Sequence, residues 1–235
     1  MSTVNRVLHP NPDTSLDVYV ARGGMAGFKE AQQLTQQEII DKVSASGLRG
    51  RGGAGFHTGR KWIAVSGNAK ATRRPASVID NGAEGEPGTF KDRSIIRSSP
   101  FVLLEGALIA ARAVGADLVV IALKDTFHTE VALVESALEE LKAAGYGNDL
   151  EWLVFRGPDE YLYGEESALL ETIDGRYPFP RIVPTFRSGV SKDGDFGTPP
   201  PRSSTTLRRS PTCRGYLHTV RIGTGESARR SLLAR

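Results

Sequence analysis

The segment from residue 99 to residue 173 constrains the fold most, because apolar stretches of helical and strand type alternate along it. A helix started by proline over residues 99–114 is apolar nearly all round, and residues 117–123 (DLVVIAL) then form an unbroken apolar run. Such a run is typical of a strand that is covered on both faces. Helical spacing follows over residues 131–145, then a strand at 150–155 and a helix at 165–173. This order predicts an α/β fold with an open, mostly parallel sheet and flanking helices.

The stretch before this segment adds one strand and two helices. Thr35 and Glu38 form a capping-box pattern, which predicts a helix that ends at Gly47. A further helix is expected over residues 60–67, and a short apolar strand over 76–80. Ligands of open parallel sheets bind beyond the carboxyl ends of the strands, so the loops that follow the predicted strands are candidate sites.

The chain divides into three parts by composition. Residues 1–34 are a polar, glycine-containing N-terminal extension, with one weak strand-like stretch at Leu16–Val20. Residues 35–186 hold the alternating segments and form the expected α/β domain. Residues 187–235 are rich in Pro, Ser, Thr and Arg, which predicts a disordered or irregular tail. This tail carries a net charge of +7, against −4 for residues 1–186, so the basic character of the chain belongs to the tail.

Cysteine content and hydropathy exclude several kinds of site. The single cysteine, Cys213, excludes a disulfide framework and any zinc or iron–sulfur site built from several cysteines of this chain. The sequence has no apolar run of transmembrane length and no basic-then-apolar signal at its N-terminus. We therefore expect a cytoplasmic protein without direct membrane insertion, peripheral to a membrane only through a complex.

The first loop with chemical information is rich in glycine and runs from Gly50 to Phe56 (GRGGAGF). Gly50, Gly52 and Gly53 let the backbone approach a ligand and expose amides that can cradle a phosphate. A predicted helix begins just after the loop, which favours an anion, and Lys61 adds a positive charge. A solvated surface turn would give the same pattern, and the loop is neither a Walker A motif nor preceded by a strand.

Two further loops place carboxylates beyond predicted strands. The segment NGAEGEPGT carries Glu84 and Glu86, whose spacing of two suits paired acceptors for ribose hydroxyls. The segment YLYGEES places Glu165 and Glu166 at a helix start, directly after a glycine that allows close approach. The alternative is structural in both cases: a solvated acidic turn, or carboxylates that interact favourably with the helix dipole.

Together and in this order, the three loops resemble one family. The combination GLRGRGGAGF, GRKW, NGAEGEPGTFKDR and YLYGEESALLETIDGR is similar to the flavin- and NADH-binding subunit of respiratory complex I. It is also similar to the diaphorase subunits of NAD-reducing hydrogenases and NAD-linked formate dehydrogenases. The resemblance covers residues 35–186 and implies a Rossmann-like domain that holds FMN and NADH in one cavity. It further implies hydride transfer from NADH to FMN and the onward transfer of single electrons to an iron–sulfur cluster.

The resemblance also implies roles for individual residues. Phe56 would pack on the adenine of NADH, Glu86 would accept a ribose hydroxyl, and Glu166 would lie on the NADH side of the cavity. Hydride transfer between stacked rings needs positioning rather than a nucleophile or general acid, so no catalytic side chain is expected. Contacts to FMN are implied for residues of all three loops and for the lysine that follows the first: Gly50, Arg51, Gly52, Lys61, Asn81, Tyr161, Gly164 and Glu165. Gly53 and Glu84 are further candidates for cofactor binding.

The sequence departs from the family pattern in two ways, at single positions and in the segment after the third loop. Ala83 stands where the family commonly has an aspartate, so weakened FMN binding is expected. After the third loop the family continues into an Asn-Asn segment, a ubiquitin-like domain and a helical domain whose four cysteines hold a [4Fe–4S] cluster, and the sequence shows none of these.

The composition of the tail suggests a reason for the second departure. A one-base shift of reading frame over PPPRSSTTLRRSPTCRG permits codons for PAVVNNVETLADVPG, which looks like the missing family segment. We hypothesise that the chain is read out of frame from about residue 198, which would make it a C-terminally truncated subunit. The coding DNA tests this hypothesis: a homologous segment that is intact in the frame of residues 1–186 supports it, and the absence of NNVET from every frame contradicts it.

Three functions follow from these observations, in decreasing order of support. The first is an oxidoreductase subunit that binds FMN and NADH and partners other electron-transfer subunits. The second is a truncated, non-catalytic remnant of that subunit. The third is a nucleic-acid binder that uses the basic tail. From residue 198 on the tail has only Tyr216 as an aromatic residue, so we expect no nucleic-acid partner.

Overall fold

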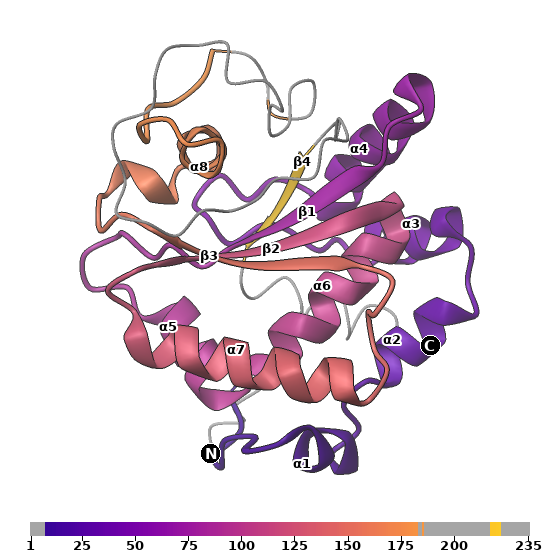
Figure 1. Cartoon of the computed structure of the whole chain (residues 1–235). Coiled ribbons are helices and arrows are strands. Elements are labelled where there is room, and N and C mark those ends of the chain that lie inside the picture. The colour runs from indigo at the N-terminus through magenta and orange to yellow at the C-terminus, as the bar shows by residue number, and fades with distance from the viewer. Residues whose placement is uncertain (1–7, 183–184, 186–216, 222–235) are drawn as a thin grey trace, which may run out of the picture.

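The computed structural model describes residues 8–182, 185 and 217–221 of the chain. Parallel strands form one sheet in the order β3-β2-β1-β4 (Figure 1). Its strands are β1 (Ala76–Asn81), β2 (Ala116–Lys124), β3 (Glu151–Gly157) and β4 (Leu217–Arg221). The helices are α1 (Leu16–Ala21), α2 (Ala26–Gln32), α3 (Gln36–Ala45), α4 (Thr58–Thr72), α5 (Lys91–Ser98), α6 (Pro100–Val114), α7 (His128–Ala143), the 3-10 turn η1 (Leu162–Gly164) and α8 (Glu166–Ile173). The predicted α/β class with a parallel sheet is confirmed.

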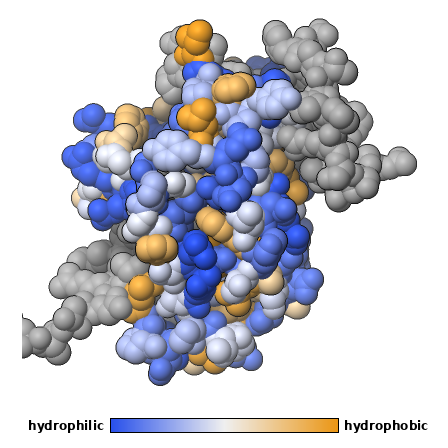
Figure 2. Space-filling model, turned by 90° about the vertical axis from the view of Figure 1, so that its left-hand side faces the viewer, coloured by the Kyte–Doolittle hydropathy of each residue, from blue (hydrophilic) through white to orange (hydrophobic). Residues whose placement is uncertain are grey.

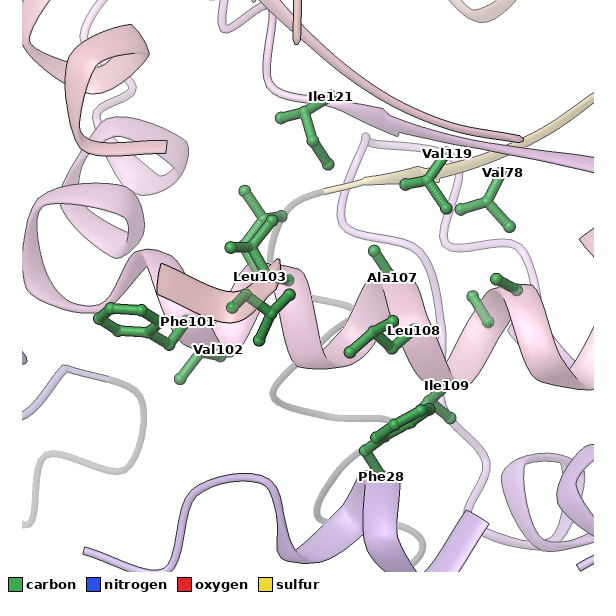
Figure 3. Packing of buried hydrophobic residues seen from close by; sticks show 14 of the residues in the cluster. Phe28, Val78, Phe101, Val102, Leu103, Ala107, Leu108, Ile109, Val119 and Ile121 are labelled. Carbon is green, nitrogen blue, oxygen red and sulfur yellow. The ribbon is translucent and has the colours of Figure 1, made fainter. Parts of the chain in front are cut away.

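The larger core lies between the sheet and the helices beneath it in Figure 1. Figure 3 shows Val78, Val119 and Ile121 of β1 and β2 above α6, which presents Leu103 and Ala107. Nearly every residue of α6 is buried, as its unbroken apolar surface predicts. Helices α3 and α4 extend this core at one end, α5 lies towards the carboxyl ends of the strands, and α7 runs along the underside of the sheet.

A smaller core lies on the opposite face of the sheet, under α8. Ile79, Val120 and Phe155 project to this face and pack against Tyr163 and Leu169. Because side chains alternate along a strand, β1 sends Val78 and Asp80 to the α6 face, and Ile79 and Asn81 to the α8 face. The last two residues of β1 therefore support elements on opposite faces of the sheet.

The N-terminal extension is helical, so the weak strand-like stretch predicted at Leu16–Val20 was wrong. Ser15 caps α1 by accepting a hydrogen bond from the Val18 amide at 3.3 Å, and Leu16 and Tyr19 are buried on the core. A local cap and tertiary burial outweigh the strand preference of these residues. The carboxylate of Glu105, buried inside α6, holds α2 by accepting from the amides of Met25 and Phe28, each at 3.0 Å.

The predicted capping box is present, since Thr35 and Glu38 exchange side-chain and backbone hydrogen bonds at the start of α3. The helix predicted over residues 60–67 is longer at both ends, as α4. Sequence periodicity missed α2 and α5, because both are short and carry few apolar residues at helical spacing.

The tail also differs from its prediction at one place. The segment predicted as irregular contains β4, which pairs with β1 in parallel from Ser77 opposite Leu217 to Asn81 opposite Arg221. The edge of β1 that faces away from β2 provides hydrogen-bonding groups for β4. The sequence LHTVR also contains residues that favour extended structure. The rest of the segment from 187 on lies outside the described residues, as does most of the region to which the frameshift hypothesis applies.

No single helix in the described part of the chain is long and apolar enough to cross a membrane. The pair α5 and α6 meets the length and composition criteria only when joined, and it is bent by 101° at the break.

Candidate functional site

A hollow of about 430 Å³ lies where the three sequence loops meet, beyond the carboxyl end of β1. The strands run towards the left of Figure 1, and Figure 2 shows that side of the molecule, where hydrophobic residues are scattered among hydrophilic ones. Residues from all three loops and from the start of α5 line the hollow: Arg51, Gly52, Gly53, Asn81, Ala83, Glu84, Gly85, Glu86, Thr89, Lys91, Asp92, Tyr161, Leu162, Gly164 and Glu165.

Asn81 fastens the second loop to the third. Its side-chain amide donates to the carbonyl oxygen of Gly164 at 2.9 Å, and its own oxygen accepts from the Ala83 amide at 3.2 Å. The Gly82 amide donates to the carbonyl of Ala122 at 2.8 Å, which ties the same loop to the end of β2. These bonds fix the floor of the hollow with atoms of the loops themselves.

Gly164 is required for this close approach. A Cβ atom at this position would lie 2.6 Å from the Ala83 carbonyl oxygen, which is too short for any real contact. Gly85 has a milder restriction, with a Cβ position 3.3 Å from the Tyr161 carbonyl oxygen. The glycine in the third loop thus serves backbone packing between loops, which leaves the adjoining space open to a ligand.

Two of the predicted site carboxylates also cap helices. Glu165 precedes α8 and accepts from the amides of Ser167 at 2.9 Å and Ala168 at 2.8 Å. Glu84 accepts from the Asp92 amide at 3.1 Å, at the start of α5. Each carboxylate therefore satisfies free amides of a helix N-terminus while it lines the hollow. Glu84 and Glu165 thus have the structural role at a helix start that the sequence left open, and both also remain candidates for ligand binding.

Glu86 and Tyr161 join the second and third loops at the rim. The Tyr161 hydroxyl donates to the Glu86 carboxylate at 2.7 Å, and both side chains are exposed. The hydrogen bond and the negative charge of Glu86 raise the pKa of Tyr161, since both favour the protonated phenol. This carboxylate is the one for which the sequence predicts a ribose hydroxyl.

Lys61 lies beside Glu166 rather than on the wall of the hollow. Its ammonium is 2.8 Å from one carboxylate oxygen of Glu166 and 2.9 Å from the other. The Thr185 hydroxyl donates to the same carboxylate at 2.7 Å. The ion pair joins α4, which follows the glycine loop, to α8, which follows the third loop.

The glycine loop is closed by bonds between its two ends. The Gly50 amide donates to the carbonyl of Phe56 at 2.8 Å, and the Thr58 amide donates to the carbonyl of Leu48 at 2.9 Å. Gly53 has φ 98°, a conformation that other residues rarely adopt. Phe56, at the end of this loop, has 58% of its surface exposed.

The structure brings most of the predicted site residues together. Nine of them line the hollow, whereas Gly50, Phe56, Lys61 and Glu166 lie beside it in the same loops and helices. Sequence reasoning missed Gly85, Thr89, Lys91, Asp92 and Leu162 as lining residues. Lys91 and Asp92 could have been predicted as lining residues from their position at the start of α5. The weak apolar periodicity of α5 prevented the prediction of that helix.

Comparison with known proteins identifies the family. A sequence profile described as the Nuo51 FMN-binding domain matches residues 43–194, well over half of the chain. The chain belongs to this family. This match confirms the family resemblance that the three loops predict. The family is defined by an FMN-binding domain.

Curated relatives and solved structures agree with the Nuo51 assignment. The chain is 40% identical over 180 residues to an NADH-quinone oxidoreductase subunit of Aquifex aeolicus, and 42% identical over 186 residues to the corresponding protein of Rickettsia typhi. These matches cover 73% and 76% of this chain, but only 41% and 43% of the relatives. The chain thus spans about two fifths of their length.

The fold also matches that of an NAD⁺-reducing [NiFe]-hydrogenase, solved by crystallography in its H₂-reduced state. The TM-score is 0.73 at 27% sequence identity, over 94% of this chain and 35% of the hydrogenase chain. The air-oxidised form of such a hydrogenase gives a TM-score of 0.72 at 28% identity. This Nuo51 domain therefore shares its α/β architecture with chains of known redox assemblies.

Proposed function

We propose that this chain is the FMN-binding part of an NADH-oxidising subunit, which takes FMN into the hollow and NADH at its rim. The observation that carries the proposal is the convergence of the three loops on one hollow at the carboxyl edge of a parallel sheet. The family assignment and the relatives, which are named NADH-quinone oxidoreductase subunits, support it.

The chemistry of the lining residues fits FMN. The volume of about 430 Å³ lies within the usual range for small-molecule sites. Backbone amides of Gly52 and Gly53 suit a phosphate, while Asn81 and Glu165 offer an amide and a carboxylate to a polar ring edge and to hydroxyl groups. The close approach at Gly164 keeps bulky atoms off the floor. These residues would hold FMN without a catalytic acid or base.

The rim suits a dinucleotide. Phe56 offers an exposed aromatic face to an adenine, and Glu86 offers carboxylate oxygens to ribose hydroxyls. Glu166 and Lys61 lie next to the wall, where they would set the charge on the NADH side. The chemistry that FMN would supply here is acceptance of a hydride from NADH and release of single electrons. The residues of this chain would position the two rings for that transfer.

The onward electron acceptor is proposed to lie on another polypeptide or segment. The described residues contain no group of His, Cys, Asp and Glu that could hold a metal ion. Because the relatives are named as subunits of NADH-quinone oxidoreductase, we assign electron transfer to partner subunits that carry iron–sulfur clusters, in a complex at the cytoplasmic face of a membrane or in a soluble assembly.

FMN titration of the purified full chain tests the proposal. We expect saturable, one-to-one quenching of FMN fluorescence and NADH oxidation with an artificial acceptor. Asn81→Ala removes the bridge between two loops and should weaken FMN binding, whereas Asn148→Ala, exposed at the far end of the sheet, serves as the matched control. A folded chain that shows no saturable FMN binding would overturn the proposal and favour the non-catalytic remnant.

A further inference from the structure

Asp80 is a buried carboxyl group that the proposed function does not use. It is the penultimate residue of β1, only 1% of its surface is exposed, and its Oδ1 atom has no hydrogen-bond partner. An ionised carboxylate in this position would lack the hydrogen bonds that a buried charge requires. The side chain lies on the α6 face of the sheet, opposite in direction to the neighbouring Asn81.

The charges of Asp92 and Lys91, at the start of α5, act on the carboxyl group of Asp80. The carboxylate of Asp92 is itself buried and pairs with the Lys91 ammonium, and both residues line the hollow. The neighbour of Asp80 in register on β2 is Ile121, and α6 presents apolar side chains to this face. Asp80 therefore meets one like charge and one opposite charge in otherwise apolar surroundings.

These surroundings favour the neutral acid. Burial is the largest cause that raises the pKa of Asp80 well above its ordinary value, and the charge of Asp92 adds to it, while Lys91 acts in the opposite direction. Because the pKa of Asp80 is raised in the folded chain, its contribution to stability is fully present only at pH values below the pKa of the same group in the unfolded chain. That stabilisation is lost as the pH rises towards and through the raised value.

We propose that Asp80 is a positioning residue that must carry a proton to keep Lys91 and Asp92 in the wall of the hollow. Ionisation adds a second negative charge that acts on the buried carboxylate of Asp92, and we expect this repulsion to displace the start of α5. The Asp92 amide, which donates to Glu84, then loses its fixed place, and Glu84 lines the same wall. Binding at the hollow consequently weakens as the pH rises. This last consequence rests on the proposed function, whereas the proton on Asp80 does not.

The test compares wild type with Asp80→Asn, which keeps the shape and removes the charge. Denaturant unfolding of the full chain without flavin should show that Asp80→Asn gains stability relative to wild type as the pH is raised, with little difference in acid. Amide hydrogen exchange at Asp92 and Arg93 should become faster at high pH in wild type only. Asp125→Asn, at the exposed end of the neighbouring strand β2, is the matched control and should show neither effect. A stability difference that is the same at every pH, or that disfavours Asp80→Asn throughout, overturns the proposal.

FMN titrations across the same pH range separate this inference from the proposed function. We expect wild-type affinity to fall by up to about tenfold per pH unit once Asp80 ionises, the limit for one proton, and the affinity of Asp80→Asn to stay flat. FMN affinity with the same pH dependence in both proteins overturns the coupling to the hollow. Absence of FMN binding together with the predicted stability profile supports the proton on Asp80 and contradicts the proposed function.

Discussion

The Lys61 ammonium lies 2.8 Å from the carboxylate of Glu166, although the two residues are 105 positions apart in the chain. The sequence predicts both as ligand-binding residues on separate loops, and the structure joins them directly. Any anionic ligand group that reaches Lys61 must compete with this carboxylate. The ion pair therefore joins Lys61, whose positive charge is predicted to act on FMN, to Glu166, which is predicted to lie on the NADH side.

Glu166→Gln should increase FMN affinity, because the amide holds the Lys61 ammonium less strongly than a carboxylate does. The gain should shrink with added salt, since both side chains are partly exposed and their attraction is screened. Fluorescence titration with FMN at two ionic strengths measures this gain in affinity. Glu135→Gln is the control: it breaks the exposed ion pair between Glu135 on α7 and Arg156 on β3, and it should leave FMN affinity unchanged. Lower affinity in Glu166→Gln than in wild type would contradict this interpretation.

The bond between Tyr161 and Glu86 should be visible in the titration of the phenol. The hydrogen bond to Glu86 and its negative charge raise the pKa of Tyr161 above the ordinary value of 10.0, so the phenol keeps its proton to higher pH. Glu86→Gln should move the pKa back towards that value. Near-ultraviolet absorbance of tyrosinate measures the shift, with Tyr161→Phe identifying which phenol is observed. An unchanged titration in Glu86→Gln would show that the two side chains do not interact in solution.

Gly164→Ala should separate the second and third loops, because its Cβ would lie 2.6 Å from the Ala83 carbonyl oxygen. We expect a loss of about 1–3 kcal/mol in the free energy of unfolding, typical of forced overpacking, and weaker FMN binding. Gly67→Ala is the control: it lies inside α4 with nothing within 4 Å, so alanine should stabilise the chain by about 0.5–1 kcal/mol. Denaturant unfolding measures both, and equal effects of the two changes would rule out the close contact.

The residues that line the hollow could be predicted from the sequence more completely than the elements that support them. Asn81, Glu86 and Tyr161 lie in loops beyond recognisable apolar strands, and the order of these loops resembles one family. Lys91 and Asp92 could not, since α5 has few apolar residues and is held by tertiary contacts. Its Arg93 and Arg97 reach the buried Glu130 on α7 at 3.2 and 2.6 Å. Such long-range ion pairs leave no periodic signal in the chain.

The role of Glu84 and Glu165 as helix caps could be predicted only in part. Glutamates near a helix start are expected from the helix dipole, but which amide each accepts from depends on the fold of the loop. The Asp80 carboxyl gives the opposite lesson, because in the sequence it is simply the polar end of an apolar strand. Its burial follows from the packing of α6 under β1.

Ala83→Asp should tighten FMN binding. Ala83 lines the hollow and stands where the resemblance places an aspartate, so the change adds a hydrogen-bond acceptor to the wall. We expect a several-fold lower dissociation constant, in line with about 1 kcal/mol for one net hydrogen bond. Ala64→Asp, on the exposed side of α4, is the matched control. Unaltered affinity in Ala83→Asp would show that the missing carboxylate does not limit FMN binding.

Glu105→Gln should loosen the N-terminal helices from the core without changing the hollow. The carboxylate of Glu105 accepts from the Tyr19 hydroxyl and the Met25 amide on one oxygen and from the Phe28 amide on the other. A glutamine has a single carbonyl oxygen, so at least one buried donor then faces an amide group and stays unpaired. The expected cost is about 1–3 kcal/mol in the free energy of unfolding. Glu139→Gln, exposed on α7, should cost nothing measurable. Faster amide exchange at Met25 and Phe28, with unchanged exchange in the loops of the hollow, would locate the effect; equal unfolding free energies of Glu105→Gln and wild type would contradict the buried clamp.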